Sequence, residues 1–71
     1  MNIEIVGKDK NGIRRVYGLH ENLQHLAINA CIEAGEDYLQ TRPDIDALYL
    51  YNGDTDQPII SSATNRVFEI R

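Results

Sequence analysis

The chain begins with an alternation of apolar and polar residues that predicts a β-hairpin over residues 2–18. Ile3 and Ile5 alternate with polar neighbours, which is typical of a strand with one face on a core. Residues 9–12 (DKNG) combine an Asp that bonds its own backbone with a Gly that takes positive φ, so we expect a turn there. Residues 13–18 (IRRVYG) then return as a second strand and end in glycine.

The central segment, residues 21–41, has the period of an amphipathic helix. Asn22 is the expected N-cap, because its side-chain oxygen can accept a hydrogen bond from an amide of the first turn. Pro43 ends the helix near Thr41, since proline disfavours the helical conformation of the residue before it. The expected core face consists of Leu23, Leu26, Ala27, Ala30, Cys31, Ala34 and Tyr38.

A second apolar set on the same helix lies roughly opposite this face and consists of Ile28, Ile32 and Leu39. One sheet covers a helix stripe of about 100°, whereas the apolar positions extend over more than half of the circumference. Three explanations remain open. The loop 53–65 folds back over this set with Ile59 and Ile60, or the set forms a homodimer or a docking groove for another protein, or it is simply exposed.

Residues 47–52 (ALYLYN) alternate again and predict a third strand. Leu48 and Leu50 are expected to face the helix, which leaves Tyr49 and Tyr51 on the opposite face with Tyr17 nearby. Such tyrosines stack on nucleic-acid bases, anchor protein interfaces, or simply pair with each other across strands.

The remaining residues predict a short strand at 58–61 and a last strand at 66–71 (RVFEIR). The short strand must lie at a sheet edge, because Pro58 cannot donate a ladder hydrogen bond. The order β-β-α-β-β indicates an α+β fold, with an antiparallel sheet of about four strands and one long helix on one face. Residues 1–71 are expected to form a single domain. The strand residues expected in the core are Ile3, Ile5, Ile13 or Val16, Leu48, Leu50, Phe68 and Ile70.

Charge is distributed unevenly along the 71 residues, whose net charge is −4. Four basic residues and one acid give residues 8–15 a charge of +3, and ten acids against three arginines give the rest −7. The basic residues of the hairpin are Lys8, Lys10, Arg14 and Arg15. A basic ribbon can follow a phosphate backbone, so nucleic-acid binding is the alternative function. An ordinary solvated hairpin tip and a basic contact patch for an acidic protein partner are the other interpretations of these residues. The low pI of about 4.9 and the expected lack of a Lys/Arg stripe beside the tyrosines favour a protein partner instead.

The sequence contains no pattern typical of catalysis or metal binding. Two acidic pairs, which lack the Gly and Glu of a calcium loop, are Asp44/Asp46 and Asp54/Asp56. His20 and His25 are five residues apart, so they do not share a helix face; His20 is expected in a turn and His25 in contact with solvent. Cys31 lies in the expected core stripe as an inert thiol, and one helix on one sheet leaves little concavity for a cleft. We therefore expect no enzyme, no cofactor and no metal.

A single cysteine cannot form an internal disulfide, and the first ten residues lack a long apolar stretch. These features indicate a cytoplasmic protein without a membrane anchor, and no segment matches a diagnostic family motif. The interpretation is a non-catalytic protein-interaction module, whose partner-binding residues are Tyr49 and Tyr51 or the ridge Ile28/Ile32/Leu39. Such a module is expected to regulate or inhibit a larger partner by occlusion, as compact accessory proteins of phage and other mobile elements do.

Overall fold

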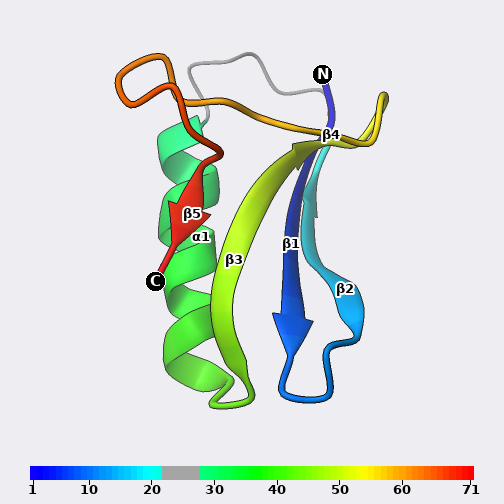
Figure 1. The fold of residues 1–71 in the computed structure, drawn as a ribbon, viewed down its shortest axis with the longest axis vertical. Helices are drawn as coiled ribbons and strands as arrows, with labels where there is room; N and C mark the ends of the chain where they lie inside the picture. Colours follow the sequence, from blue (N-terminus) through cyan, green and yellow to red (C-terminus); the bar gives the residue numbers. More distant parts are fainter. Residues whose placement is uncertain (22–27) are drawn as a thin grey trace.

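A computed structural model describes residues 1–21 and 28–71, and it has one helix packed across one face of an antiparallel sheet (Figure 1). The predicted α+β class is therefore confirmed. The elements are β1 (Ile3–Asp9), β2 (Arg14–His20), α1 (Ile28–Thr41), β3 (Ile45–Asn52), β4 (Gln57–Pro58) and β5 (Glu69–Ile70). The strand order is β2-β1-β3-β4, and β5 also pairs with β3, so β1 and β3 form the centre of the sheet.

The β1–β2 hairpin closes through Asp9, as its turn chemistry predicts. The Asp9 carboxylate accepts hydrogen bonds from the amides of Asn11 (2.9 Å) and Ile13 (3.1 Å), and its carbonyl accepts one from Gly12 (2.9 Å). Gly12 has a φ of 77°, a conformation that costs a residue with a Cβ more than it costs glycine. The second strand does not end at Gly18 as expected, but continues to His20.

A bulge in this hairpin reverses the faces of β2. Ile5 pairs with Gly18, whereas the next residue, Val6, pairs with Val16, so Tyr17 is the additional residue of β2. Val16 consequently lies on the side of the sheet away from the helix. It is 49% exposed and Ile13 is 50% exposed, so the expectation that one of them joins the core is wrong.

The helix ends where the sequence predicts, at Thr41, whose hydroxyl donates a hydrogen bond to the carbonyl of Asp37 (3.0 Å). Glu21, the expected start of the helix, lies in a turn. The Asn22 cap and the predictions for Leu23, His25, Leu26 and Ala27 concern residues outside the described part of the chain.

The face that α1 turns toward the sheet agrees with the predicted one in part, since Ala34 and Tyr38 pack against the core as expected. Cys31 is buried as expected, but Ala30 is exposed and Gly35 is buried instead. A Cβ at Gly35 would collide with the end of the Ile70 side chain on β5, so glycine at residue 35 allows this side chain to pack closely against the helix. The buried core consists of Ile3, Ile5, Cys31, Ile45, Leu48, Leu50 and Ile70.

The C-terminal third runs along the edge of β3 that does not pair with β1. Ile45 is buried and already belongs to β3, so the strand begins two residues before the predicted start at residue 47. The short strand is residues 57–58 rather than 58–61, and it lies at a sheet edge as Pro58 requires. The amide of Asn65 donates to the carbonyl of Ser61 (2.8 Å) in a single turn, and the last strand contains only Glu69–Ile70 of the expected 66–71.

Candidate binding groove on the sheet

The face of the sheet away from α1 is organised in cross-strand rows that the register defines. Leu48 and Leu50 of β3 are fully buried toward the helix, so Tyr49 and Tyr51 lie on the opposite face. Tyr49 pairs with Val6, and Val6 pairs with Val16, which makes an apolar row across three strands.

A basic row lies directly beside this apolar row. Lys8 follows Val6 by two residues on β1 and pairs with Arg14 on β2. On the other side of the apolar row, Glu4 of β1 pairs with Tyr51 of β3. The sequence interpretation that no Lys/Arg stripe accompanies the tyrosines is therefore wrong. Lys8 faces the same way as Val6 by alternation alone, and the bulge determines only that its partner on β2 is Arg14.

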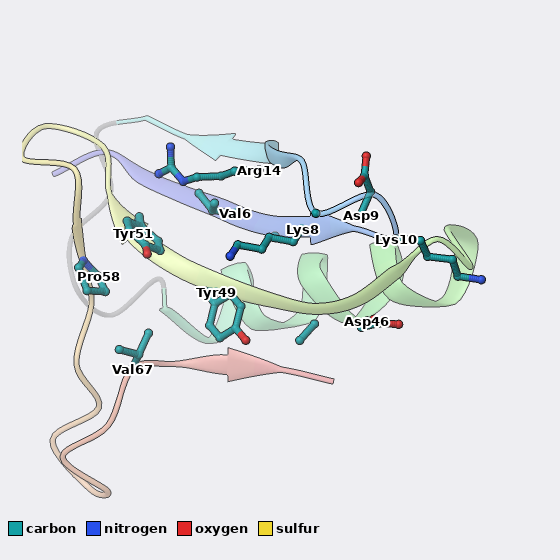
Figure 2. Close-up of a pocket in the computed structure, with 13 residues that line it drawn as sticks. Val6, Lys8, Asp9, Lys10, Arg14, Asp46, Tyr49, Tyr51, Pro58 and Val67 are labelled. Carbon is teal, nitrogen blue, oxygen red and sulfur yellow. The ribbon is translucent and has the colours of Figure 1, made fainter.

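Several residues of these rows line a groove with a volume of about 580 Å³, namely Val6, Tyr49, Tyr51, Lys8 and Arg14. Figure 2 shows Lys8 and Arg14 above β1 and β2, with Pro58 and Val67 along the outer side of β3. The expectation of little concavity does not hold, because the returning C-terminal segment adds a raised side to the sheet. The groove is lined by Val6, Gly7, Lys8, Asp9, Lys10, Gly12, Arg14, Asp46, Ala47, Tyr49, Tyr51, Pro58 and Val67.

Tyr51 is partly covered by a charged side chain. The Arg14 guanidinium lies 5.1 Å from the centre of the Tyr51 ring and forms an ion pair with Asp56, with an Nη2–Oδ1 distance of 3.0 Å. This arrangement combines a cation–π contact with a solvent-exposed salt bridge. Arg14 therefore already has a carboxylate partner within the protein, and its guanidinium covers one face of the Tyr51 ring.

Tyr49 is held by the C-terminal strand. Its hydroxyl donates to Oε1 of Glu69 (3.2 Å), and the same oxygen accepts hydrogen bonds from Nη2 (2.8 Å) and Nε (3.0 Å) of Arg71. Burial raises the pKa of Tyr49 above its ordinary value of 10.0, and the hydrogen bond to Glu69 raises it further. The hydrogen bond from Arg71 lowers the pKa of Glu69. Tyr49 therefore remains a neutral phenol at physiological pH, with its ring fixed in the groove.

The basic residues of the hairpin divide into two groups. Arg15 lies 3.5 Å from the Asp9 carboxylate and does not line the groove. Lys8, Lys10 and Arg14 do line it, and within residues 1–21 and 28–71 neither lysine forms an ion pair. The structure thus brings three of the four basic residues of the nucleic-acid alternative to the tyrosine face.

Tyr17 lies on the helix side of the sheet, contrary to the expectation that it accompanies the other tyrosines. The Arg42 guanidinium is 5.7 Å from the centre of its ring and 5.6 Å from that of Tyr38. A Cβ built at Gly7 would lie 3.3 Å from Tyr17 Cε2, which places this ring beside the helix-facing side of β1. Tyr17 therefore connects the end of α1 to the sheet.

The ridge Ile28/Ile32/Leu39 is half-buried and packs against the core. The chain itself supplies much of the covering that the sequence left unexplained, and Ile59 and Phe68 pack against the same core. Binding of a partner to the ridge stays a prediction. Because the ridge is partly covered by the chain itself, the open face of the sheet is the better candidate for a binding surface.

Other residues of chemical interest are dispersed. Burial raises the pKa of the Cys31 thiol, and His20 is a half-buried strand residue rather than part of a turn. In the described ranges, no group of three His, Cys, Asp or Glu side chains is arranged to hold a metal ion. Nor does any helix of these ranges combine the length and hydropathy needed to traverse a bilayer.

Val6, Pro58 and Val67 are groove residues that the sequence analysis did not identify. The strict alternation of β1 was a usable signal for Val6, which had to face away from Ile5. Pro58 and Val67 reach the groove only through the path of the C-terminal segment, and no local pattern indicates that path.

In comparisons with known proteins, no family model, curated protein or solved structure matches this chain.

Proposed function

We propose that this protein is a non-catalytic module that binds another protein through the groove on the helix-free face of its sheet. The observation that carries the proposal is a groove with a volume of about 580 Å³. Its lining combines the buried Val6 with Tyr49, Tyr51, Pro58 and Val67. Half-buried tyrosines in a pocket supply large apolar contact area at low cost in conformational entropy, which is typical of protein interfaces. By occupying a segment of a larger partner, such a module regulates it through occlusion.

The Tyr49–Glu69–Arg71 hydrogen bonds support a rigid recognition surface. Because the Tyr49 ring is already held in one orientation, binding does not have to order it again, and a ligand loses less affinity to conformational entropy. The buried side chains beneath it, Leu48 and Leu50, fix the strand that carries both tyrosines.

A matched pair of variants tests the proposal, because Ile60 and Val67 face each other in one isolated β-bridge. Both are exposed, but only Val67 lines the groove. A random dodecapeptide library displayed on phage is selected against the immobilised protein, and the enriched peptides are synthesised. We expect Val67→Ser to weaken their binding about fivefold or more and Ile60→Ser to leave it unchanged. If no peptide binds in a Val67-dependent way, the groove is not a protein-binding surface.

Single-stranded nucleic acid is the second candidate, and the presence of Lys8 and Arg14 on the tyrosine face favours it. Against it, Arg14 is paired with Asp56 and covers Tyr51, and Glu4 lies beside the same ring. A fluorescent oligothymidine titrated at low and high salt decides between them. Binding that weakens steeply with salt and with Tyr49→Ala supports this candidate, and an absence of binding at low salt removes it.

A further inference from the structure

Two adjacent rows on the open face differ in chemistry and have a fixed spacing. The apolar row contains Val16, Val6 and Tyr49, and the basic row contains Arg14 and Lys8. Neighbouring rows are two residues apart along each strand, which is about 6.6–6.8 Å. This is the spacing of the backbone positions, and a ligand that covers both rows must present an apolar group and, close to it, an anionic group.

An extended peptide meets this requirement, because its side chains at positions i and i+2 point to the same side with the same spacing. A helical ligand places neighbouring groups on one face at i, i+3 and i+4, which does not reproduce the row spacing as directly. The open face of the sheet thus fits a segment that runs along the strand direction.

Lys8 is the unpaired cation of the basic row, whereas Lys10, which also forms no ion pair in the described ranges, lies in the hairpin turn. Arg14 is paired with Asp56, and Arg15 with Asp9, whereas no carboxylate among the described residues lies within ion-pair distance of Lys8. Figure 2 shows its ammonium end directed along the sheet toward the two tyrosine rings. A ligand whose anionic group binds there forms an ion pair with Lys8, and its neighbouring apolar group contacts the apolar row.

The negative charges around the groove limit how acidic the ligand can be. Asp46 lines the hairpin end, Glu4 lies beside Tyr51, and the whole chain carries a net charge of −4. A polyanion is repelled by this field, whereas a segment with one or two carboxylates gains the contact with Lys8 at little cost.

We infer that the occupant of the groove is an extended segment of another protein in which an Asp or Glu stands two positions from a large apolar residue. The carboxylate binds Lys8, and the apolar side chain lies against Val6 and Tyr49. This inference rests on the proposed function, and it adds the chemistry and spacing of the partner segment.

The peptides enriched from the dodecapeptide library test it. We expect Asp or Glu to be enriched two positions from an apolar residue. Lys8→Gln should weaken binding of such a peptide about two- to fivefold at low salt, with a smaller effect at high salt. Arg66→Gln removes the same charge from an exposed side chain that does not line the groove, and it should change little.

The outcomes separate the two proposals. If the peptides require Val67 but lack acidic residues, or bind the Lys8→Gln variant with unchanged affinity, the acidic-segment inference is overturned and the protein-binding proposal stands. If no peptide requires Val67, the protein-binding proposal fails as well. Light scattering that detects a concentration-dependent dimer abolished by Val67→Ser identifies a second copy of this chain as the occupant, and this also overturns the inference.

Discussion

Gly7 in the central strand β1 provides the sharpest test of the packing that supports the groove. A Cβ built at this position would lie 2.7 Å from Cδ2 of Leu48 and 2.8 Å from the carbonyl oxygen of Ala47. Leu48 is itself fully buried, and the oxygen belongs to the backbone of β3. The Leu48 side chain can move only by repacking within the core, and the Ala47 oxygen cannot move away without separating the two strands that form the centre of the sheet.

The expected cost of Gly7→Ala follows from two opposing effects. Overpacking of a well-packed core costs about 1–3 kcal/mol, and the rigid carbonyl places this site above the lower end of that range. The loss of glycine's freedom in the unfolded chain returns about 0.4–1 kcal/mol. We expect a net loss of about 1–2 kcal/mol, which lowers the Tm of a domain of this size by about 4–16 °C.

Thermal unfolding followed by circular dichroism measures this effect. Gly12→Asn is a matched control, because Gly12 has no neighbouring atom within 4 Å of a built Cβ and its φ of 77° is one that Asn tolerates. The control should leave Tm nearly unchanged. If Gly7→Ala melts at the wild-type temperature or above it, β1 and β3 are not packed as closely as described and the reasoning is refuted.

Three further predictions test other parts of the molecule. Ile32→Asp should lower Tm strongly rather than only dissociate a dimer, because the half-buried side chain packs against the core; a stable monomeric variant would contradict this. Arg42→Ala should lower the free energy of unfolding in urea by about 1 kcal/mol, because the contacts with two tyrosine rings are lost. Arg42→Lys keeps the charge and should lose less of this free energy. Glu69→Gln should lower the pKa of Tyr49 toward 10.0 without reaching it, since burial remains the larger cause; NMR titration of the tyrosine ring carbons measures the shift. Because the pKa of Tyr49 is higher in the folded state than in the unfolded state, protonated Tyr49 contributes stability below pH 10.0. This contribution is lost as the pH rises through the folded-state pKa of Tyr49.

Local chemistry was sufficient to predict the elements whose cause lies within a few residues. The Asp9 turn depends on side-chain and backbone hydrogen bonds inside residues 9–13, and the end of α1 at Thr41 depends on Pro43 two residues later. The inward orientation of Leu48 and Leu50 follows from alternation alone.

The rotation of the helix could not be predicted in the same way. Its apolar residues extend over most of its circumference, so periodicity allows more than one buried face. The choice depends on β5, whose residue Ile70 needs the space that Gly35 leaves. The burial of Gly35 thus involves a contact with a residue far away in sequence, which local periodicity does not reveal.

The bulge at Tyr17 determines the chemistry of the groove. If the register between Ile5 and Gly18 continued without the additional residue, Tyr17 would pair with Val6 on the open face and Val16 would face the helix. Arg15 would then stand opposite Lys8 in place of Arg14, and the Arg14–Asp56 ion pair over Tyr51 would not form there. One inserted residue thus moves an aromatic ring to the helix side, where Arg42 packs on it. The open face keeps an apolar row next to Lys8, which forms no ion pair among the described residues, and for this reason the groove suits a segment of limited acidity better than a nucleic-acid strand.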